Sequence, residues 1–118
     1  MGLLRSFRFA FRGLGQVLAR ERNARVHLAA AAVALGASVW LGLDRAELAL
    51  VVLTIALVLA AEVVNTVVER LLDLLHPAHS ERVRAIKDMS AAAVLVTAIG
   101  ALAVAGLLLL PCLIDRLR

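Results

Sequence analysis

The stretch AEVVNTVVERLLDLLHP, residues 61–77, places polar side chains directly after a run of fourteen residues without charge, residues 48–61. Its polar residues follow one another at spacings of three, four and four: Glu62, Asn65, Glu69 and Asp73. These spacings put all four side chains on one face of an α-helix. The stretch therefore predicts a long apolar helix whose last turns carry a polar stripe.

The composition indicates a membrane protein. Of the 118 residues, 63% are hydrophobic, against about 45–50% in an ordinary soluble domain. Three apolar segments are long enough to cross a bilayer: residues 26–43, 46–75 and 86–114. A soluble helical bundle is the alternative, but residues 89–114 carry neither a charge nor the polar stripe that a soluble helix needs. We expect one all-α membrane domain over residues 1–118.

The first twenty residues have a helical pattern of their own. Apolar residues recur at spacings of three and four: Leu3, Phe7, Ala10, Leu14 and Leu18. Arg5, Arg8 and Arg12 fall on the opposite face. This pattern predicts an amphipathic helix over residues 3–20 that lies in the headgroup plane, with a solvated basic arm as the alternative.

The distribution of charge predicts the orientation in the membrane. The net charge is +4, and six arginines among the first 25 residues are opposed by Glu21 alone. The positive-inside rule therefore places the N-terminus and the loop over residues 76–88 in the cytoplasm. Three crossings would leave the C-terminus, with Arg116 and Arg118, on the outer side.

Glu62 is expected inside the bilayer. If the second span enters the hydrocarbon near Leu48 on the outer side, Glu62 lies roughly 21 Å in, about 9 Å short of the inner boundary of a ~30 Å core. Ionisable residues at such depths are rare and mark functional sites. In a purely structural alternative, Glu62 pairs with an arginine to fix helix packing and Asn65 joins neighbouring helices.

Other charges are expected at the same cytoplasmic level. Glu21 precedes the first span, and Glu69 lies near the inner end of the second. Two carboxylates, with phosphates and water, are a typical Mg²⁺ ligand set. Lys87 and Asp88 open the third span, where Lys87 in the first helical turn could reach a phosphate beside free backbone N–H groups. A phosphate-bearing nucleotide fits this combination.

The sequence contains none of the motifs of soluble kinases. A Walker A loop, a glycine-rich kinase loop and an HRD catalytic loop are all absent. His76 and His79 flank Pro77 in the loop, either as plain loop residues or as nucleotide contacts. The single Cys112 cannot form an internal disulfide.

Four stretches together resemble the small integral-membrane prokaryotic diacylglycerol kinase and undecaprenol kinase family. They are RSFRFAFRGL (5–14), ARERNARVHLAAA (19–31), AAEVVNTVVERLLDLL (60–75) and AIKDMSAAAVLV (85–96). The resemblance covers nearly the whole chain. It implies a multi-pass protein of the bacterial cytoplasmic (inner) membrane, with three membrane helices and one surface helix per subunit, in a homotrimer whose active sites are shared between subunits and use MgATP.

The resemblance also implies roles for individual residues. Glu62 resembles the family's general base, and Glu21 and Glu69 resemble its metal ligands. The residues expected to contact the nucleotide are Asn65, Glu69, Asp73, His79, Lys87 and Asp88. Those expected to contact the lipid are Phe9, Arg12, His27 and Glu62. The family position of Phe9 is often tyrosine, and that of His79 is displaced by one residue.

We expect a lipid kinase that transfers the γ-phosphate of MgATP to the terminal hydroxyl of a membrane lipid alcohol. ATP and the lipid are its substrates, Mg²⁺ is its cofactor, and no nucleic acid is expected as a partner. His27, where enterobacterial diacylglycerol kinases have an acid, favours undecaprenol over diacylglycerol. The alternatives are an oligomeric proton or cation path that uses Glu62 and Glu69, and a purely structural membrane subunit.

Overall fold

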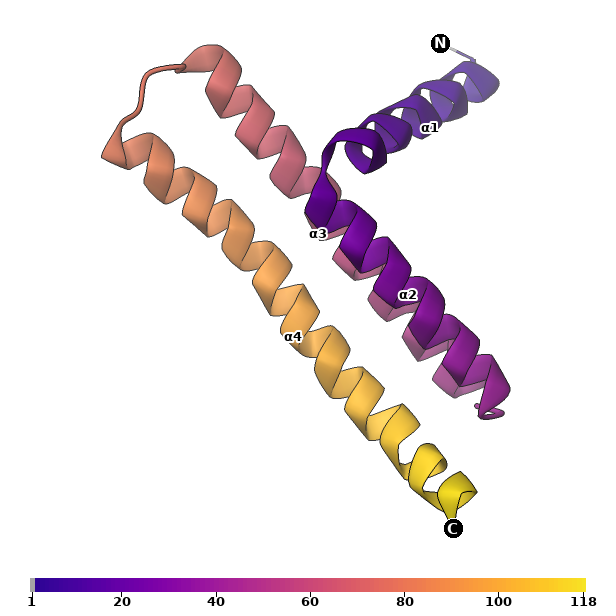
Figure 1. Cartoon of the computed structure of the whole chain (residues 1–118). Helices are drawn as coiled ribbons and strands as arrows, with labels where there is room; N and C mark the ends of the chain where they lie inside the picture. Colours follow the sequence, from indigo (N-terminus) through magenta and orange to yellow (C-terminus); the bar gives the residue numbers. More distant parts are fainter. Residues whose placement is uncertain (1) are drawn as a thin grey trace.

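The computed structural model describes residues 2–118, and this part of the chain is helical apart from short connections. Its four helices are α1 (Leu3–Arg20), α2 (Arg22–Trp40), α3 (Arg45–Leu75) and α4 (Glu81–Leu117). Helices α2, α3 and α4 lie side by side, whereas α1 leads away from them at an angle (Figure 1). The all-α class expected from the sequence is confirmed.

The turn between α2 and α3 has a clear chemical basis. Gly42 adopts a φ of 75°, in the left-handed region where a side chain would be strained. Asp44 then caps α3, because its Oδ1 accepts a hydrogen bond from the N–H of Glu47 at 2.9 Å while Glu47 Oε1 accepts from the N–H of Asp44. The Glu47 backbone hydrogen bond lowers the pKa of the Asp44 carboxyl below its usual value.

Helix α4 begins earlier than the sequence predicted. Its first residue is Glu81, five residues before the expected start at residue 86, because the Ser80 side chain accepts a hydrogen bond from the N–H of Val83 at 3.1 Å and caps the helix. Lys87 consequently lies in the second helical turn. The expectation that free N–H groups of a helix end lie beside Lys87 is therefore wrong.

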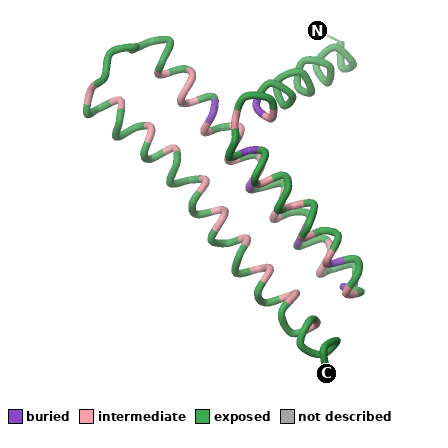
Figure 2. The backbone as a smooth tube through the Cα atoms, in the orientation of Figure 1, coloured by how far each residue is buried: buried purple, intermediate pink, exposed green. Residues whose placement is uncertain are grey.

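Half of the buried residues of the small core lie on α3. This helix packs against both α4 and α2, whereas α2 and α4 touch each other little. Val51, Val58, Glu62 and Thr66 are buried at helical spacing on one face of α3 (Figure 2). Within its described length α4 has no buried residue. The interior is thus apolar at one end of α3 and polar towards the other.

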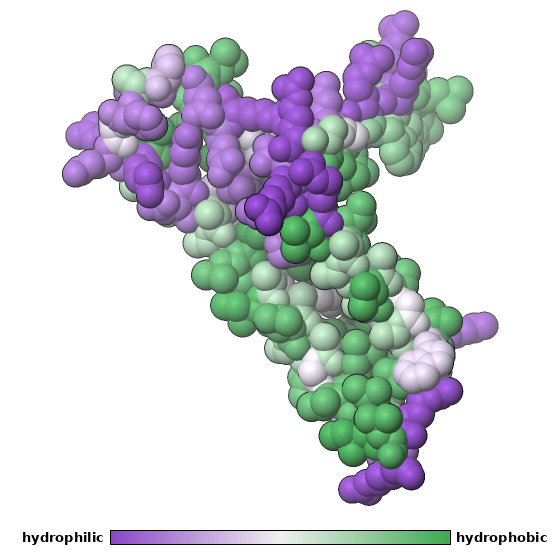
Figure 3. Space-filling model, in the orientation of Figure 1, coloured by the Kyte–Doolittle hydropathy of each residue, from purple (hydrophilic) through white to green (hydrophobic). Residues whose placement is uncertain are grey.

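Hydropathy divides the molecule along its long axis. Hydrophilic residues gather around α1 and the α3–α4 loop, while the opposite part of the helical bundle is largely hydrophobic up to a few polar groups at its far end (Figure 3). Within residues 2–118, α3 and α4 are the helices long and apolar enough to cross a membrane by length and composition. Helix α2 does not pass that test.

Candidate functional site

The centre of the site is the carboxyl group of Glu62. Its side chain is only 4% exposed, and Oε1 lies 3.0 Å from Nε2 of His27 on α2. The distance suits an ion pair, but the N–H is not aligned on the oxygen, so Oε1 has no hydrogen-bond partner among the described residues. Because an unpaired buried carboxylate is costly, His27 is the group that offsets its burial.

The next turns of α3 continue the polar face. Thr66 is buried and its hydroxyl donates to the backbone oxygen of Glu62 at 3.0 Å. The side-chain oxygen of Asn65 is buried without a partner in the described chain. Two buried oxygens thus lie one helical turn apart, Glu62 Oε1 and Asn65 Oδ1, and each could accept a hydrogen bond that the described chain does not provide.

The two expected metal ligands lie near Glu62. Glu21 lies at the start of α2 and Glu69 follows Glu62 by two turns of α3, and both carboxylates are near enough to Glu62 to act on it electrostatically. Glu21 Oε1 lies 3.7 Å from Nη2 of Arg70, and both side chains are partly exposed. Such exposed pairs contribute only about 0–1 kcal/mol. The structure therefore brings the three glutamates, which belong to the α1–α2 junction and to α3, into one neighbourhood.

Two of the expected nucleotide contacts bind each other. Lys87 Nζ on α4 donates to Asp73 Oδ1 on α3 at 2.6 Å. The pair joins the ends of these helices next to the loop that connects them. A phosphate that approaches Lys87 would meet a partly neutralised ammonium group.

His79 and Asp88 lie farther along the same end of the molecule. Both line a surface depression of about 500 Å³ beside the start of α4. Asp88 Oδ1 also lies 3.9 Å from Nε of Arg84, one turn earlier on α4. These side chains are exposed and do not contact Glu62 in the described structure.

Phe9 and Arg12 lie on α1, away from Glu62. Both residues are exposed, and the Arg12 guanidinium lies 5.7 Å from the centroid of the Phe9 ring. Val17, two turns later, is the buried residue of this helix. Within one described chain, these expected lipid contacts are therefore not brought to the carboxylate.

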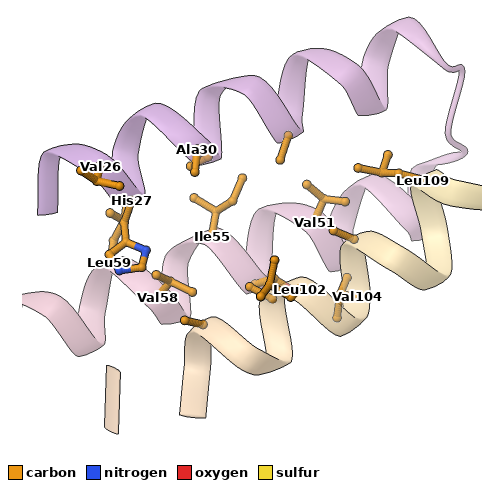
Figure 4. A pocket seen from close by; sticks show the side chains of 16 residues that line it. Val26, His27, Ala30, Val51, Ile55, Val58, Leu59, Leu102, Val104 and Leu109 are labelled. Atoms are coloured by element: carbon orange, nitrogen blue, oxygen red, sulfur yellow. The ribbon is translucent and has the colours of Figure 1, made fainter. Parts of the chain in front are cut away.

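An apolar cavity of about 380 Å³ lies between α2, α3 and α4 (Figure 4). It runs from His27 and Leu59 at one end to Val51 and Leu109 at the other, and alanines form much of its wall. Two lining side chains are polar, His27 and Thr54. The Thr54 hydroxyl already donates to the oxygen of Leu50 at 2.6 Å. His27 therefore supplies the remaining polar side chain of the wall.

Sequence reasoning missed Arg70 and Thr66. Arg70 was detectable as a basic residue next to Glu69, near the C-terminal end of α3. Thr66 follows Glu62 by four residues and so shares its helical face. The sequence offered no signal for the His27–Glu62 contact, which joins two helices across 35 positions.

The donor chemistry at this end of the molecule fits Mg²⁺. Residues 2–118 contain no group of three acidic, histidine or cysteine side chains that could enclose a metal ion. Mg²⁺ needs no such cage, because it is usually held by one or two carboxylates together with phosphates and water. Glu69 makes no side-chain contact with a basic group in the described chain, and the Glu21–Arg70 pair is weak.

Comparisons with known proteins identify the family of the chain. The model of the prokaryotic diacylglycerol kinase family matches residues 8–109. The chain is 38% identical over 114 residues to a diacylglycerol kinase of Synechocystis sp., covering 96% of this chain and 65% of that protein. It is 33% identical over 107 residues to an undecaprenol kinase of Bacillus subtilis, covering 91% of this chain and 87% of that protein. The chain thus spans less than two thirds of the Synechocystis relative.

Proposed function

Because the chain belongs to the prokaryotic diacylglycerol kinase family, we propose that it is a membrane lipid kinase. It transfers the γ-phosphate of MgATP to the terminal hydroxyl of a membrane lipid alcohol. The two named relatives are a diacylglycerol kinase and an undecaprenol kinase. The family does not favour the alternative of a proton or cation path.

One observation carries the proposal: a buried carboxylate lies next to the polar end of an apolar cavity. Val58 and Leu59 line the cavity, and Glu62 follows them by one turn of α3, about 6 Å along the axis. A lipid alcohol has the matching shape, with a hydrocarbon chain for the cavity and a hydroxyl for the carboxylate. A cation path would not need an apolar cavity that matches a hydrocarbon chain.

In this mechanism Glu62 accepts or orients the proton of the lipid hydroxyl while the hydroxyl oxygen attacks the γ-phosphorus. The bond between the γ-phosphorus and the β–γ bridging oxygen breaks, and ADP leaves. Because this carboxylate is buried beside an apolar cavity, its surroundings would favour attack by the lipid over attack by water. Lys87 and Asp73, with Asn65, Asp88 and His79, orient the nucleotide at the cytoplasmic end. Phosphoryl transfer depends mainly on such positioning and on charge stabilisation.

Glu21 and Glu69 would hold Mg²⁺. When bound, the ion would neutralise charge on the β- and γ-phosphates. Arg70 follows Glu69 in the sequence, and its guanidinium contacts Glu21. This contact would have to break for the Glu21 carboxylate to bind the ion. The Asn65 oxygen, buried and unpartnered, remains available to the nucleotide complex.

The acceptor is proposed to be undecaprenol in preference to diacylglycerol. The cavity wall is largely alanine and valine, so it presents an apolar surface to the hydrocarbon of either acceptor. The preference is supported by the resemblance, because histidine stands at position 27 where enterobacterial diacylglycerol kinases have an acid.

We further propose a homotrimer with α2, α3 and α4 as three spans, α1 as the surface helix and the N-terminus in the cytoplasm. Supporting features are the exposed apolar side chains of α4, such as Leu102 and Leu107, and the polar end formed by α1 and the α3–α4 loop (Figure 3). Active sites shared between subunits would let Phe9 and Arg12 of one chain serve a neighbour's lipid.

The test is a labelled-ATP assay on purified protein in mixed micelles, with undecaprenol and diacylglycerol supplied separately. Label should enter the lipid only when an alcohol is present, and faster with undecaprenol. Acetylated undecaprenol, which lacks the hydroxyl, is the matched control and should remain unlabelled. Absence of label in both alcohols would refute the kinase function, whereas faster labelling of diacylglycerol would refute only the acceptor preference.

A further inference from the structure

His27 occupies the boundary between the apolar cavity and the buried carboxylate. Its side chain lines the cavity together with apolar neighbours (Figure 4). Its Nε2 nevertheless lies 3.0 Å from Glu62 Oε1. Its side chain is 26% exposed, so the imidazole is held largely within the protein. A polar group in such a wall either binds the ligand or serves another protein group.

The contacts favour the second role. The nitrogen that faces the polar end is engaged with Glu62, so it is not free to bind a lipid hydroxyl while that contact lasts. Oε1 of Glu62 accepts no hydrogen bond in the described chain, so its polar contact is the one with Nε2 of His27, 3.0 Å away. Among the described polar contacts, this one is therefore the contact that could fix the rotation of the Glu62 carboxyl group.

We propose that His27 is a positioning residue: its Nε2 holds Oε1 of Glu62 and thereby aims Oε2 at the acceptor hydroxyl at the inner end of the cavity. This inference rests on the proposed kinase function. It differs from the lipid-binding role that the sequence predicted for His27. The imidazole acts on the reaction through Glu62 and makes no bond to the substrate.

The role predicts a particular kinetic pattern. A positioning contact matters when the proton is transferred, so the loss of such a contact lowers kcat. A lipid contact is formed equally in the ground state and the transition state, so the loss of that contact raises KM and leaves kcat unchanged. A displacement of about 1 Å can cost about 10²-fold in rate. We expect His27→Leu to lower kcat by at least about tenfold and to change the lipid KM by less than about twofold.

A conservative variant separates positioning from packing. In His27→Gln, the side-chain amide can place an N–H group near Glu62 Oε1 in place of the imidazole nitrogen, so kcat should stay within about threefold of the wild-type value. Val33→Ala, at an exposed site of α2 outside the cavity, is the control for general changes of this helix. Thermal unfolding of each purified protein shows which variants are folded.

The outcomes are distinct. A wild-type protein that labels no lipid would refute the proposed function itself. An active wild type with a His27→Leu variant that raises KM at unchanged kcat would instead overturn the positioning role in favour of lipid contact. A folded His27→Gln variant as slow as His27→Leu would also overturn it, because an amide donor would then fail to replace the imidazole.

Discussion

Filling the apolar cavity should weaken lipid binding without slowing the chemical step. Ala101 on α4 lines the cavity between its two ends, and Ala101→Leu adds three carbon atoms to that space. If these displace about three methylenes of the lipid chain, at about 0.8 kcal/mol each, binding loses about 2.4 kcal/mol. This free energy corresponds to an increase of about 50-fold in the lipid KM.

The assay is a titration of the lipid in mixed micelles at saturating MgATP. Because chain burial is equal in the ground and transition states, kcat should be unchanged. The matched control is Ala103→Leu, which adds the same atoms to an exposed position of α4 that does not line the cavity. An unchanged KM in Ala101→Leu, or equal increases in both variants, would refute the assignment of the cavity to the lipid chain.

Three further predictions concern the proposed metal ligand Glu69, the cap of α3 and the C-terminal end of α4. Glu69→Gln should raise the Mg²⁺ concentration needed for half-maximal activity by about tenfold or more, and a normal Mg²⁺ titration would contradict its role as a ligand. The pKa of Asp44 is lower in the folded protein than in the unfolded chain, so the ionised carboxyl stabilises the fold above the unfolded pKa. This stabilisation is lost as the pH falls through the folded pKa. Acidification should therefore lower the melting temperature less in Asp44→Asn than in the wild type. The Arg116 guanidinium lies 4.3 Å from the Trp40 ring centroid, so Arg116→Gln should destabilise the protein by about 0.5–1 kcal/mol in thermal unfolding, and an unchanged melting temperature would show that the contact contributes nothing.

The sequence predicted what depends on local pattern. The polar stripe of α3 follows from the spacing of its residues, and the helical class follows from apolar runs of bilayer length. The start of α4 was misjudged because the hydrophobic signal begins near Met89, whereas the Ser80 cap begins the helix much earlier.

The contacts between helices could not be predicted in the same way. Hydropathy does not determine the rotation of α2 about its axis, so the sequence did not distinguish a His27 that faces the lipid from one that faces Glu62. The Lys87–Asp73 pair likewise depends on the path of the α3–α4 loop. These contacts require the packed structure.

The most direct test of the account is turnover and nucleotide binding in Glu62→Gln, with Glu47→Gln at the opposite end of α3 as the matched control. Loss of a general base costs about 10²–10⁴-fold in rate. We expect Glu62→Gln to lose lipid phosphorylation on this scale while MgATP affinity stays within about twofold, and Glu47→Gln to retain activity. A Glu62→Gln protein that phosphorylates lipid at the wild-type rate would contradict the central role of this carboxylate.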